Sequence, residues 1–286
     1  MHFTPVILGL VLTFPVAAQE PPQIASPPAT VAAPVVLENA GKPMLLPFRC
    51  SEEDIHVSGL SCSEDEPCPI FLELTAANQA GNRILTAGNI HSESVTIYSV
   101  LLASDDGGHT WSEAHERIRA SGLEHIQFFD PETGWILGQE LFPIPQDPFL
   151  LVTSDGGKTW RQRPIFGESS DNRFGSIQQF ALSGKKDGSI VIDRGRGNPT
   201  DRYVLFESPD AGDTWSLKQE SDKPLVLRNA AAAGTDWRIR IDGPSKSFHV
   251  EHRQGTRWNS VGAFSVKLDG CKPPQPGDGG APGNRQ

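Results

Sequence analysis

The chain has 286 residues, a length that suits one large all-β domain. Hydrophobic residues make up 37% of it, enough for a globular core, and its 28 Gly and 24 Pro residues are typical of many short strands joined by tight turns. The formal net charge of −10 repels phosphate backbones and anionic headgroups, which argues against nucleic acid and membrane-surface binding as general functions.

An apolar run from Val6 to Val16 has the length of the hydrophobic region of a signal peptide. Val16 and Ala18 are the small residues that signal peptidase needs before a cut at Ala18–Gln19, although no Lys or Arg precedes the run. A buried N-terminal strand is the alternative. The run is shorter than the about 20 residues that span a bilayer, so no membrane insertion is expected after cleavage. We therefore predict a signal peptide over residues 1–18 and export to the periplasm or the extracellular space.

Two segments rich in proline flank the expected domain. Residues 19–43 are rich in Pro and Ala and predict an extended linker without a core. Residues 272–286 are rich in Pro and Gly and predict a disordered tail. The folded domain is therefore expected over residues 44–271.

Four cysteines, Cys50, Cys62, Cys68 and Cys271, suit an oxidising compartment. They lack the CxxC spacing of common zinc sites, so two disulfides are favoured over a metal centre. Four thiols allow three pairings. We favour Cys62–Cys68 together with Cys50–Cys271, because the second pair would tie the two ends of the domain to each other.

Three segments of eight residues form an internal repeat: SDDGGHTW, TSDGGKTW and SPDAGDTW. Each follows the pattern Ser/Thr-x-Asp-x-Gly-x-Thr-Trp, and a fourth segment, EHRQGTRW, keeps only Gly255 and Trp258. Successive Trp residues lie 49, 55 and 43 positions apart, close to the length of about 40–50 residues of a four-stranded propeller blade. The repeat positions are Ser104, Asp106, Gly108, Thr110, Trp111, Thr153, Asp155, Gly157, Thr159, Trp160, Ser208, Asp210, Gly212, Thr214 and Trp215.

Each repeat has the pattern of four short strands. A Gly precedes an apolar run in every unit and lies 24–30 residues before the Trp of that unit. Pro and Gly residues separate the runs, and no window sustains a helical period. The four units are expected over residues 69–118, 123–166, 174–220 and 225–269.

The repeat resembles the Asp-box, or bacterial neuraminidase repeat, of sialidases and other β-propellers. The phrase FFDPETGWILG ahead of TSDGGKTW is similar to the photosystem II assembly-factor-like family of propellers. The resemblance implies an all-β propeller of four-stranded antiparallel blades with four recognisable repeats. A fifth partial blade from residues 44–66, or completion of the last blade by a Met44–Phe48 strand, would assist closure.

The resemblance also implies that the repeat residues are structural. The Asp carboxylates are expected to accept hydrogen bonds from the backbone of their own turns, and the Gly residues to take positive φ. The Trp rings are expected to be buried between neighbouring sheets. Asp-boxes lie at the blade periphery in the resembled families, so the motif predicts the fold and no catalytic role.

No catalytic residue can be assigned from the sequence. Sialidases use a Tyr nucleophile activated by a Glu, an acid–base Asp and three Arg, and they carry a Tyr/Phe-Arg-Ile-Pro motif. Here Phe48-Arg49 is followed by Cys50, and the two tyrosines, Tyr98 and Tyr203, fit strand positions. A Gly-x-Ser-x-Gly nucleophile motif is absent from the sequence.

Metal and cofactor sites are not expected either. His249 and His252 would point to opposite faces of one strand and could not hold a single ion together. The acidic residues Glu52, Glu53 and Asp54, with a second acidic run at 64–66, are predicted to form a solvated loop, with calcium binding as the alternative.

We therefore predict a non-catalytic, exported binding or assembly scaffold for a protein, peptide or polysaccharide. The alternative is a glycoside hydrolase of sialidase-like type with an unrecognised active site. A catalytic centre predicts converging carboxyl groups, at least one of them with a raised pKa. A binding scaffold predicts an aromatic or apolar patch. The photosystem role of the resembled family does not transfer, because nothing in the sequence indicates a phototroph.

Overall fold

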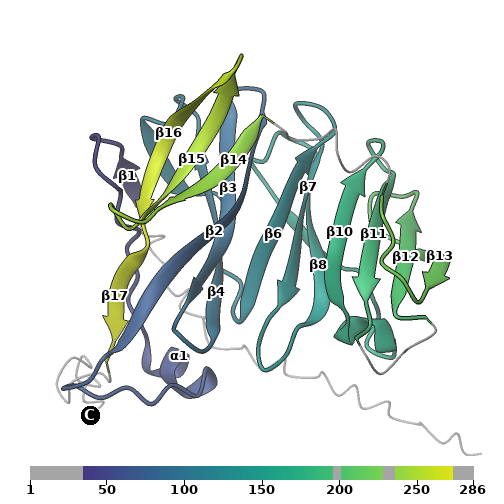
Figure 1. Cartoon of the computed structure of the whole chain (residues 1–286), viewed down its shortest axis with the longest axis horizontal. Helices are drawn as coiled ribbons and strands as arrows, with labels where there is room; N and C mark the ends of the chain where they lie inside the picture. Colours follow the sequence, from purple (N-terminus) through teal and green to yellow (C-terminus); the bar gives the residue numbers. More distant parts are fainter. Residues whose placement is uncertain (1–34, 196–200, 228–235, 273–286) are drawn as a thin grey trace, which may run out of the picture. The chain divides into compact units, whose positions relative to one another are not determined.

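The computed structural model describes residues 35–195, 201–227 and 236–272. The chain divides into two units, Met1–Ala33 and Pro34–Gln286, and all described residues belong to the second. The expected signal peptide, most of the expected linker and almost all of the expected tail lie outside the described residues. The described chain is almost entirely β-structure and forms four antiparallel sheets of three to six strands (Figure 1).

Neighbouring strands in each sheet are mostly consecutive in the chain. The sheet orders are β1-β5-β4-β3-β2-β17, β6-β7-β8-β9, β10-β11-β12-β13 and β14-β15-β16, and they are called the first to fourth sheets below. The strands of the first sheet are β1 (Val36–Glu38), β2 (Cys68–Ala80), β3 (Arg83–His91), β4 (Thr96–Ser104), β5 (Thr110–Glu113) and β17 (Lys267–Cys271). The others are β6 (Ser121–Phe128), β7 (Gly134–Glu140), β8 (Gln146–Thr153), β9 (Arg161–Pro164), β10 (Ser176–Leu182), β11 (Gly188–Asp193), β12 (Tyr203–Ser208), β13 (Ser216–Ser221), β14 (Trp237–Asp242), β15 (Ser247–Gln254) and β16 (Arg257–Ser265).

The second and third sheets have the four strands expected of one repeat, but the first and fourth sheets do not. The first sheet has two additional strands, because β1 pairs with β5 and β17 pairs with β2. β1 lies inside the range expected to be a linker. The fourth sheet has three strands within the described residues. The added strands come from segments outside the repeat, so the motif spacing could not reveal them.

The N-terminal segment joins the fourth sheet at Met44. Its N–H donates to the Ala263 carbonyl at 2.7 Å, and its carbonyl accepts from the Ser265 N–H at 2.8 Å, which makes an isolated parallel bridge to Phe264 of β16. The sequence left two alternatives for this segment, a fifth partial blade and a strand that completes the last blade. In the structure the segment pairs with the last repeat, but only through this one bridge.

Two disulfides, Cys50–Cys271 and Cys62–Cys68, lie beside the first sheet. They are the pairs favoured from the sequence. Cys50 and Cys271 are 221 residues apart in the chain, so their bond links the segment before α1 to the last strand, β17.

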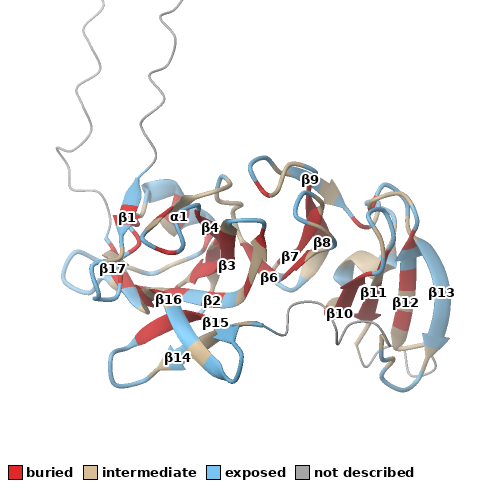
Figure 2. Ribbon diagram, turned by 90° about the horizontal axis from the view of Figure 1, so that it is seen from above, coloured by how far each residue is buried: buried red, intermediate tan, exposed pale blue. Residues whose placement is uncertain are grey.

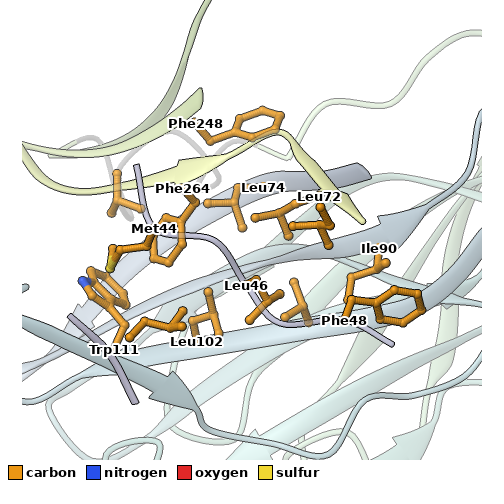
Figure 3. Close-up of a cluster of buried hydrophobic side chains, with 14 of the residues drawn as sticks. Met44, Leu46, Phe48, Leu72, Leu74, Ile90, Leu102, Trp111, Phe248 and Phe264 are labelled. Carbon is orange, nitrogen blue, oxygen red and sulfur yellow. The ribbon is translucent and has the colours of Figure 1, made fainter. Parts of the chain in front are cut away.

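Three clusters of buried side chains fill the space between the sheets. The first cluster joins the first sheet, the fourth sheet and the N-terminal segment (Figure 3) through Met44, Leu46, Phe48, Leu72, Leu74, Ile90, Leu102, Trp111, Phe248 and Phe264. A second cluster joins the second and third sheets, and a third joins the first and second. Strands β3, β7 and β11, each paired on both sides, are buried along most of their length (Figure 2).

Side-chain amides also connect neighbouring sheets. Asn78 of β2 donates to the Ile126 carbonyl of β6 at 3.1 Å. Gln127 of β6 binds both the N–H and the carbonyl of Leu182 in β10. In each case an amide on the first strand of one repeat holds the backbone of the first strand of the next repeat.

The acidic segment expected to be a solvated loop instead begins a short helix, α1 (Glu52–Val57). Ser51 is its N-cap: the Ser51 hydroxyl accepts from the Asp54 N–H at 3.1 Å, and Asp54 Oδ2 accepts from the Ser51 N–H at 2.8 Å. This reciprocal pair satisfies two N–H groups that a helix start leaves without partners. Only 2% of Asp54 is exposed. A capping box spans four residues, too few to produce a helical period in the sequence.

Candidate functional site

A pocket of about 980 Å³ is the candidate binding site. It is lined by the segment before β6, the β7–β8 connection, β9 with the loop that follows it, α1 and the short 3₁₀ helix η1 (Asp171–Phe174). Half of these residues lie in loops at the ends of strands, and such loops carry binding sites in many folds. Its apolar lining includes Val57, Ile118, Phe142, Pro143, Phe149 and Phe166.

Exposed apolar side chains neighbour the pocket in the sequence and extend its apolar character outward. Ile144 and Phe174 are each 52% exposed, and they adjoin the lining residues Pro143 and Arg173. Val57, itself a lining residue, is 43% exposed. An apolar pocket lining that includes an exposed residue such as Val57 is typical of a surface that binds another molecule.

Two charged side chains of the pocket, Arg173 and Asp147, are paired with each other. Arg173 donates through Nε and Nη2 to the two carboxylate oxygens of Asp147, at 2.7 and 2.6 Å. Its Nη1 donates to the Glu168 carbonyl at 3.2 Å. These bonds hold η1 against the start of β8 and fix the position of the exposed Phe174 ring, over which the Arg173 guanidinium lies at 5.2 Å.

A second charged group anchors α1 beside the pocket. The Tyr98 hydroxyl donates to Asp54 Oδ1 at 2.5 Å, and Nη1 of the pocket residue Arg119 donates to the same oxygen at 2.9 Å. Burial and the hydrogen bond to Asp54 raise the pKa of Tyr98 to about 12, so its phenol stays protonated at neutral pH. Burial opposes ionisation of Asp54, but the hydrogen bonds from Tyr98 and Ser51 outweigh it and lower the pKa of Asp54 below its usual value.

Two carboxyl groups that do not line the pocket are those of Glu73 on β2 and Glu124 on β6. Burial raises the pKa of Glu124, and repulsion from the Glu73 carboxylate raises it further. The Asn89 amide of β3 donates to Glu73 at 3.1 Å, and its own Oδ1 is buried without a hydrogen-bond partner among the described residues. A carboxyl group with a raised pKa beside a second carboxyl group is an arrangement that a general acid can use.

The repeat residues form three turns with the same hydrogen bonds, called the aspartate turns below. The Asp carboxylate accepts from the hydroxyl two residues before it and from the N–H and hydroxyl of the Thr four residues after it. The Thr hydroxyl lies 2.6 Å from the carboxylate in each turn, at Asp106, Asp155 and Asp210. Burial of Asp155 opposes its ionisation, but the bonds from Thr159 outweigh burial and lower its pKa to about 2.

The Gly and Trp residues of the aspartate turns contact the neighbouring sheet or other residues of the same turn. Gly108 has φ +94°, and a Cβ there would collide with the Val261 carbonyl of β16, so the position requires Gly. The Trp111 indole N–H donates to the Gly108 carbonyl at 3.2 Å, and Trp160 makes the equivalent bond to Gly157 at 3.1 Å. Trp111 is 1% exposed, whereas Trp160 and Trp215 are only half-buried. The expected burial is therefore complete for one ring of the three.

Histidines and acidic residues do not converge. His249 lies between the hydroxyls of Ser247 and Ser260, while His252 stacks on Trp237 at 4.4 Å. Within residues 35–195, 201–227 and 236–272, no group of three or more His, Cys, Asp or Glu residues could hold a metal ion. No helix in the same part of the chain is long and apolar enough to cross a membrane.

Sequence reasoning placed none of the pocket residues in a site. They are scattered over α1, loops and the ends of strands and carry no motif, and the hydrogen bonds of Arg173 and Arg119 join positions 26 and 65 residues apart. A usable signal was the unusual number of apolar residues in the loop that contains Phe142, Pro143 and Ile144, where a solvated turn would be polar.

Comparisons with known proteins give only distant similarities. No protein-family model and no curated protein sequence matches the chain. Among solved structures, the chain is similar to YCF48 bound to a D1 peptide, with 18% identity, a TM-score of 0.38 and coverage of 68% of this chain and 54% of that one. It is also similar to the GH74 xyloglucanase from Xanthomonas campestris, with 14% identity, a TM-score of 0.36 and coverage of 64% and 25%. With YCF48 from Cyanidioschyzon merolae, the chain shares 14% identity at a TM-score of 0.33, and the match covers 73% of this chain and 52% of that one. The chain therefore spans about half or less of the length of these proteins.

Proposed function

We propose that this protein is an exported binding protein that holds an apolar segment of a protein or peptide in the 980 Å³ pocket. The observation that carries the proposal is the combination of an apolar pocket lining with the exposed side chains of Val57, Ile144 and Phe174. Fixed apolar anchors in a concavity supply most of the affinity of protein interfaces. The paired charges of Arg173 and Asp147 would form the polar rim.

The proposed framework is a β-propeller whose aspartate turns are Asp-boxes. Three turns with equivalent hydrogen bonds, each at the connection between the last two strands of a repeat, support this assignment. The packing of the fourth sheet on the first, the first on the second and the second on the third also supports it. The fold alone does not set a function, so the proposal for the pocket depends on its own residues.

Export is the third part of the proposal. Two disulfides in a chain with four cysteines suit an oxidising compartment. Cleavage after Ala18 would release the mature protein, and the N-terminal sequence of the secreted or periplasmic form would test this directly.

The binding site is tested with peptides selected from a random library on the immobilised mature protein. We expect the double variant Val57→Glu/Phe174→Glu to weaken their binding at least about tenfold, because charged groups would replace an exposed apolar residue of the pocket lining and one that adjoins it. The matched control is Phe129→Glu, a 47% exposed aromatic residue outside the pocket lining, which should leave the affinity unchanged. Fluorescence anisotropy measures all three proteins, and equal affinity in the wild type and the double variant would refute the pocket as the site.

A glycoside hydrolase is the second candidate, and the Glu73–Glu124 pair favours it. Hydrolysis by two carboxyl groups needs one that is protonated and one that is ionised. Turnover of fluorogenic glycosides, a sialoside included, by the pure protein would support this candidate if Glu124→Gln abolishes it. Absence of turnover across the panel would leave the pair without a catalytic role.

Glu124→Gln also has an expected effect on stability. The folded protein binds the Glu124 proton more tightly than the unfolded chain does, so this group destabilises the fold increasingly as pH rises from below 4.5 through the raised pKa. We expect the variant to melt at a higher temperature than the wild type at about pH 7.5 and at the same temperature at about pH 4. Melting followed by circular dichroism checks this, and a stabilisation that is equal at both pH values would contradict the raised pKa.

A further inference from the structure

The fourth sheet (Figure 1) carries a continuous series of side-chain hydrogen bonds from the end of β14 to β16, called the hydroxyl relay below. The Ser245 hydroxyl donates to Asp242 Oδ2 and lies 2.7 Å from the Ser247 hydroxyl. Ser247 Oγ lies 3.2 Å from Nε2 of His249, and the other ring nitrogen, Nδ1, lies 3.0 Å from Oγ of Ser260. The relay therefore connects a carboxylate to a serine hydroxyl through two hydroxyls and an imidazole.

The carboxylate fixes the direction in which the protons of the relay point. Hydrogen bonds from the hydroxyl and the N–H of Ser245 lower the pKa of Asp242, so this group is ionised at neutral pH and can only accept. Because a hydroxyl has one proton, Ser245 donates to Asp242 and accepts the proton of Ser247. Ser247 then has no proton left for the ring, so Nε2 of His249 is the donor of their bond.

The tautomer of His249 follows from this direction. A neutral imidazole has one N–H and one acceptor nitrogen. With the proton on Nε2, Nδ1 presents its lone pair to Ser260, whose hydroxyl donates at 3.0 Å. Another acceptor near this hydroxyl, the Gly262 carbonyl, lies farther away at 3.3 Å. The structure thus places a base against the proton of Ser260, and a third group orients that base, which is the arrangement that activates a nucleophile.

Burial fixes one part of the relay and leaves the other accessible. Ser247 is 0% exposed, so water does not compete for its bond to the imidazole. His249 is half-buried, and Ser260 is exposed on β16. A molecule from solvent can therefore reach the Ser260 hydroxyl, while the group that orients the base is shielded.

Two charged residues that flank His249 on this face, Arg240 and Glu251, are paired with each other. Arg240 lies directly opposite His249 in the register of β14 and β15, and Glu251 lies directly opposite Ser260 in β16. Glu251 accepts from Arg238 and Arg240 at 2.7 Å each. Burial opposes ionisation of Glu251, but these bonds outweigh it and lower its pKa. The Glu251 carboxylate is therefore held by guanidinium groups, and the base in contact with Ser260 is His249.

We propose that Ser260 is a nucleophile for acyl transfer from a carboxylic ester, with His249 as its general base and the hydroxyl relay holding the required tautomer. Ser260 Oγ would form a bond to the carbonyl carbon as its proton passes to His249 Nδ1. The bond from that carbon to the alcohol oxygen then breaks, and the alcohol leaves with the proton of the imidazolium. The products are the free alcohol and an ester on Ser260, which water hydrolyses by the same route.

The first probe is diisopropyl fluorophosphate, in which an activated serine attacks phosphorus and fluoride leaves. Trypsin cleaves after Arg257 and Lys267, so one peptide, residues 258–267, contains both Ser260 and Ser265. Ser265 is the internal control, because its hydroxyl donates to the Lys267 carbonyl at 2.9 Å and not to an imidazole. We expect mass spectrometry to show labelling of Ser260 at least about tenfold faster than that of Ser265. Equal rates would overturn the proposal.

Variants test the base and the acyl transfer. His249→Ala should slow the labelling of Ser260 at least about tenfold, since it removes the proton acceptor. The matched control is His252→Ala on the same strand, whose ring stacks on Trp237 and which should be labelled like the wild type. Release of p-nitrophenolate from p-nitrophenyl acetate should fall at least about tenfold in Ser260→Ala. Circular dichroism checks that each variant is folded, and equal labelling of the wild type and a folded His249→Ala would refute the role of the base.

The ¹⁵N chemical shifts of the His249 ring give a measurement that does not depend on activity. We expect a protonated Nε2 and an unprotonated Nδ1 in the neutral ring. Ser247→Ala removes the acceptor of the Nε2 proton, so it should populate the other tautomer and slow the labelling of Ser260. The Val57→Glu/Phe174→Glu double variant should be labelled normally, so this reaction and binding in the pocket can fail independently. A neutral ring protonated at Nδ1 in the wild type would contradict the direction of the relay and overturn the proposal.

Discussion

Trp111→Ala is expected to destabilise the protein by about 3–5 kcal/mol, the range measured for truncation of fully buried large aromatic residues. Trp111 is 1% exposed, and its ring meets Phe264 of β16 edge-to-face at 5.4 Å. A Cβ at Gly262 would approach the indole to 3.0 Å, so the fourth sheet packs directly on this ring. Its removal would leave a cavity between the first and fourth sheets. Urea unfolding followed by circular dichroism measures the free energy of unfolding.

Trp160→Ala is the matched control for this prediction. Trp160 has the same place in its aspartate turn and the same bond from its indole to the Gly carbonyl, but it is only half-buried. We expect a loss of about 1–3 kcal/mol, because less apolar surface returns to water. Equal losses in both variants would contradict the view that packing between sheets, and not the turn itself, determines the effect.

Loss of the Cys50–Cys271 disulfide is expected to cost about 5 kcal/mol, since it closes a loop of more than 200 residues. In the chain-entropy account, a longer closed loop restricts the unfolded chain more strongly. The bond also ties β17, an edge strand of the first sheet, to the segment before α1. The double variant Cys50→Ser/Cys271→Ser, compared with the wild type by urea unfolding, measures this contribution.

The Cys62–Cys68 disulfide provides the internal comparison. Its cysteines are six residues apart, and the same account gives about 2 kcal/mol for so short a loop. Cys62→Ser/Cys68→Ser should therefore be clearly more stable than the variant that lacks Cys50–Cys271. The reverse order would show that local packing around the cysteines, and not loop length, controls the stability of this region.

The spacing of the repeat motif predicted the extents of the second and third sheets well. The expected unit at 123–166 corresponds to β6–β9, which run from Ser121 to Pro164, and the expected unit at 174–220 corresponds to β10–β13, which run from Ser176 to Ser221. Alternation of apolar residues and the turn-forming Gly and Pro residues act over two to four positions, so they can be recognised locally. The first and fourth sheets departed from four strands because β1, β17 and Met44 pair with segments far away in the chain.

The sequence by itself determined the two repeat units that fold as the second and third sheets and the positions of the aspartate turns, because both depend on short-range patterns. Four thiols left three possible pairings, and the structure has the favoured one. The tertiary structure alone decided the pocket and the burial of Asp54. Asp54 meets Tyr98 and Arg119 from 44 and 65 positions away. Contacts of this kind depend on how whole sheets pack, which no local pattern of residues encodes.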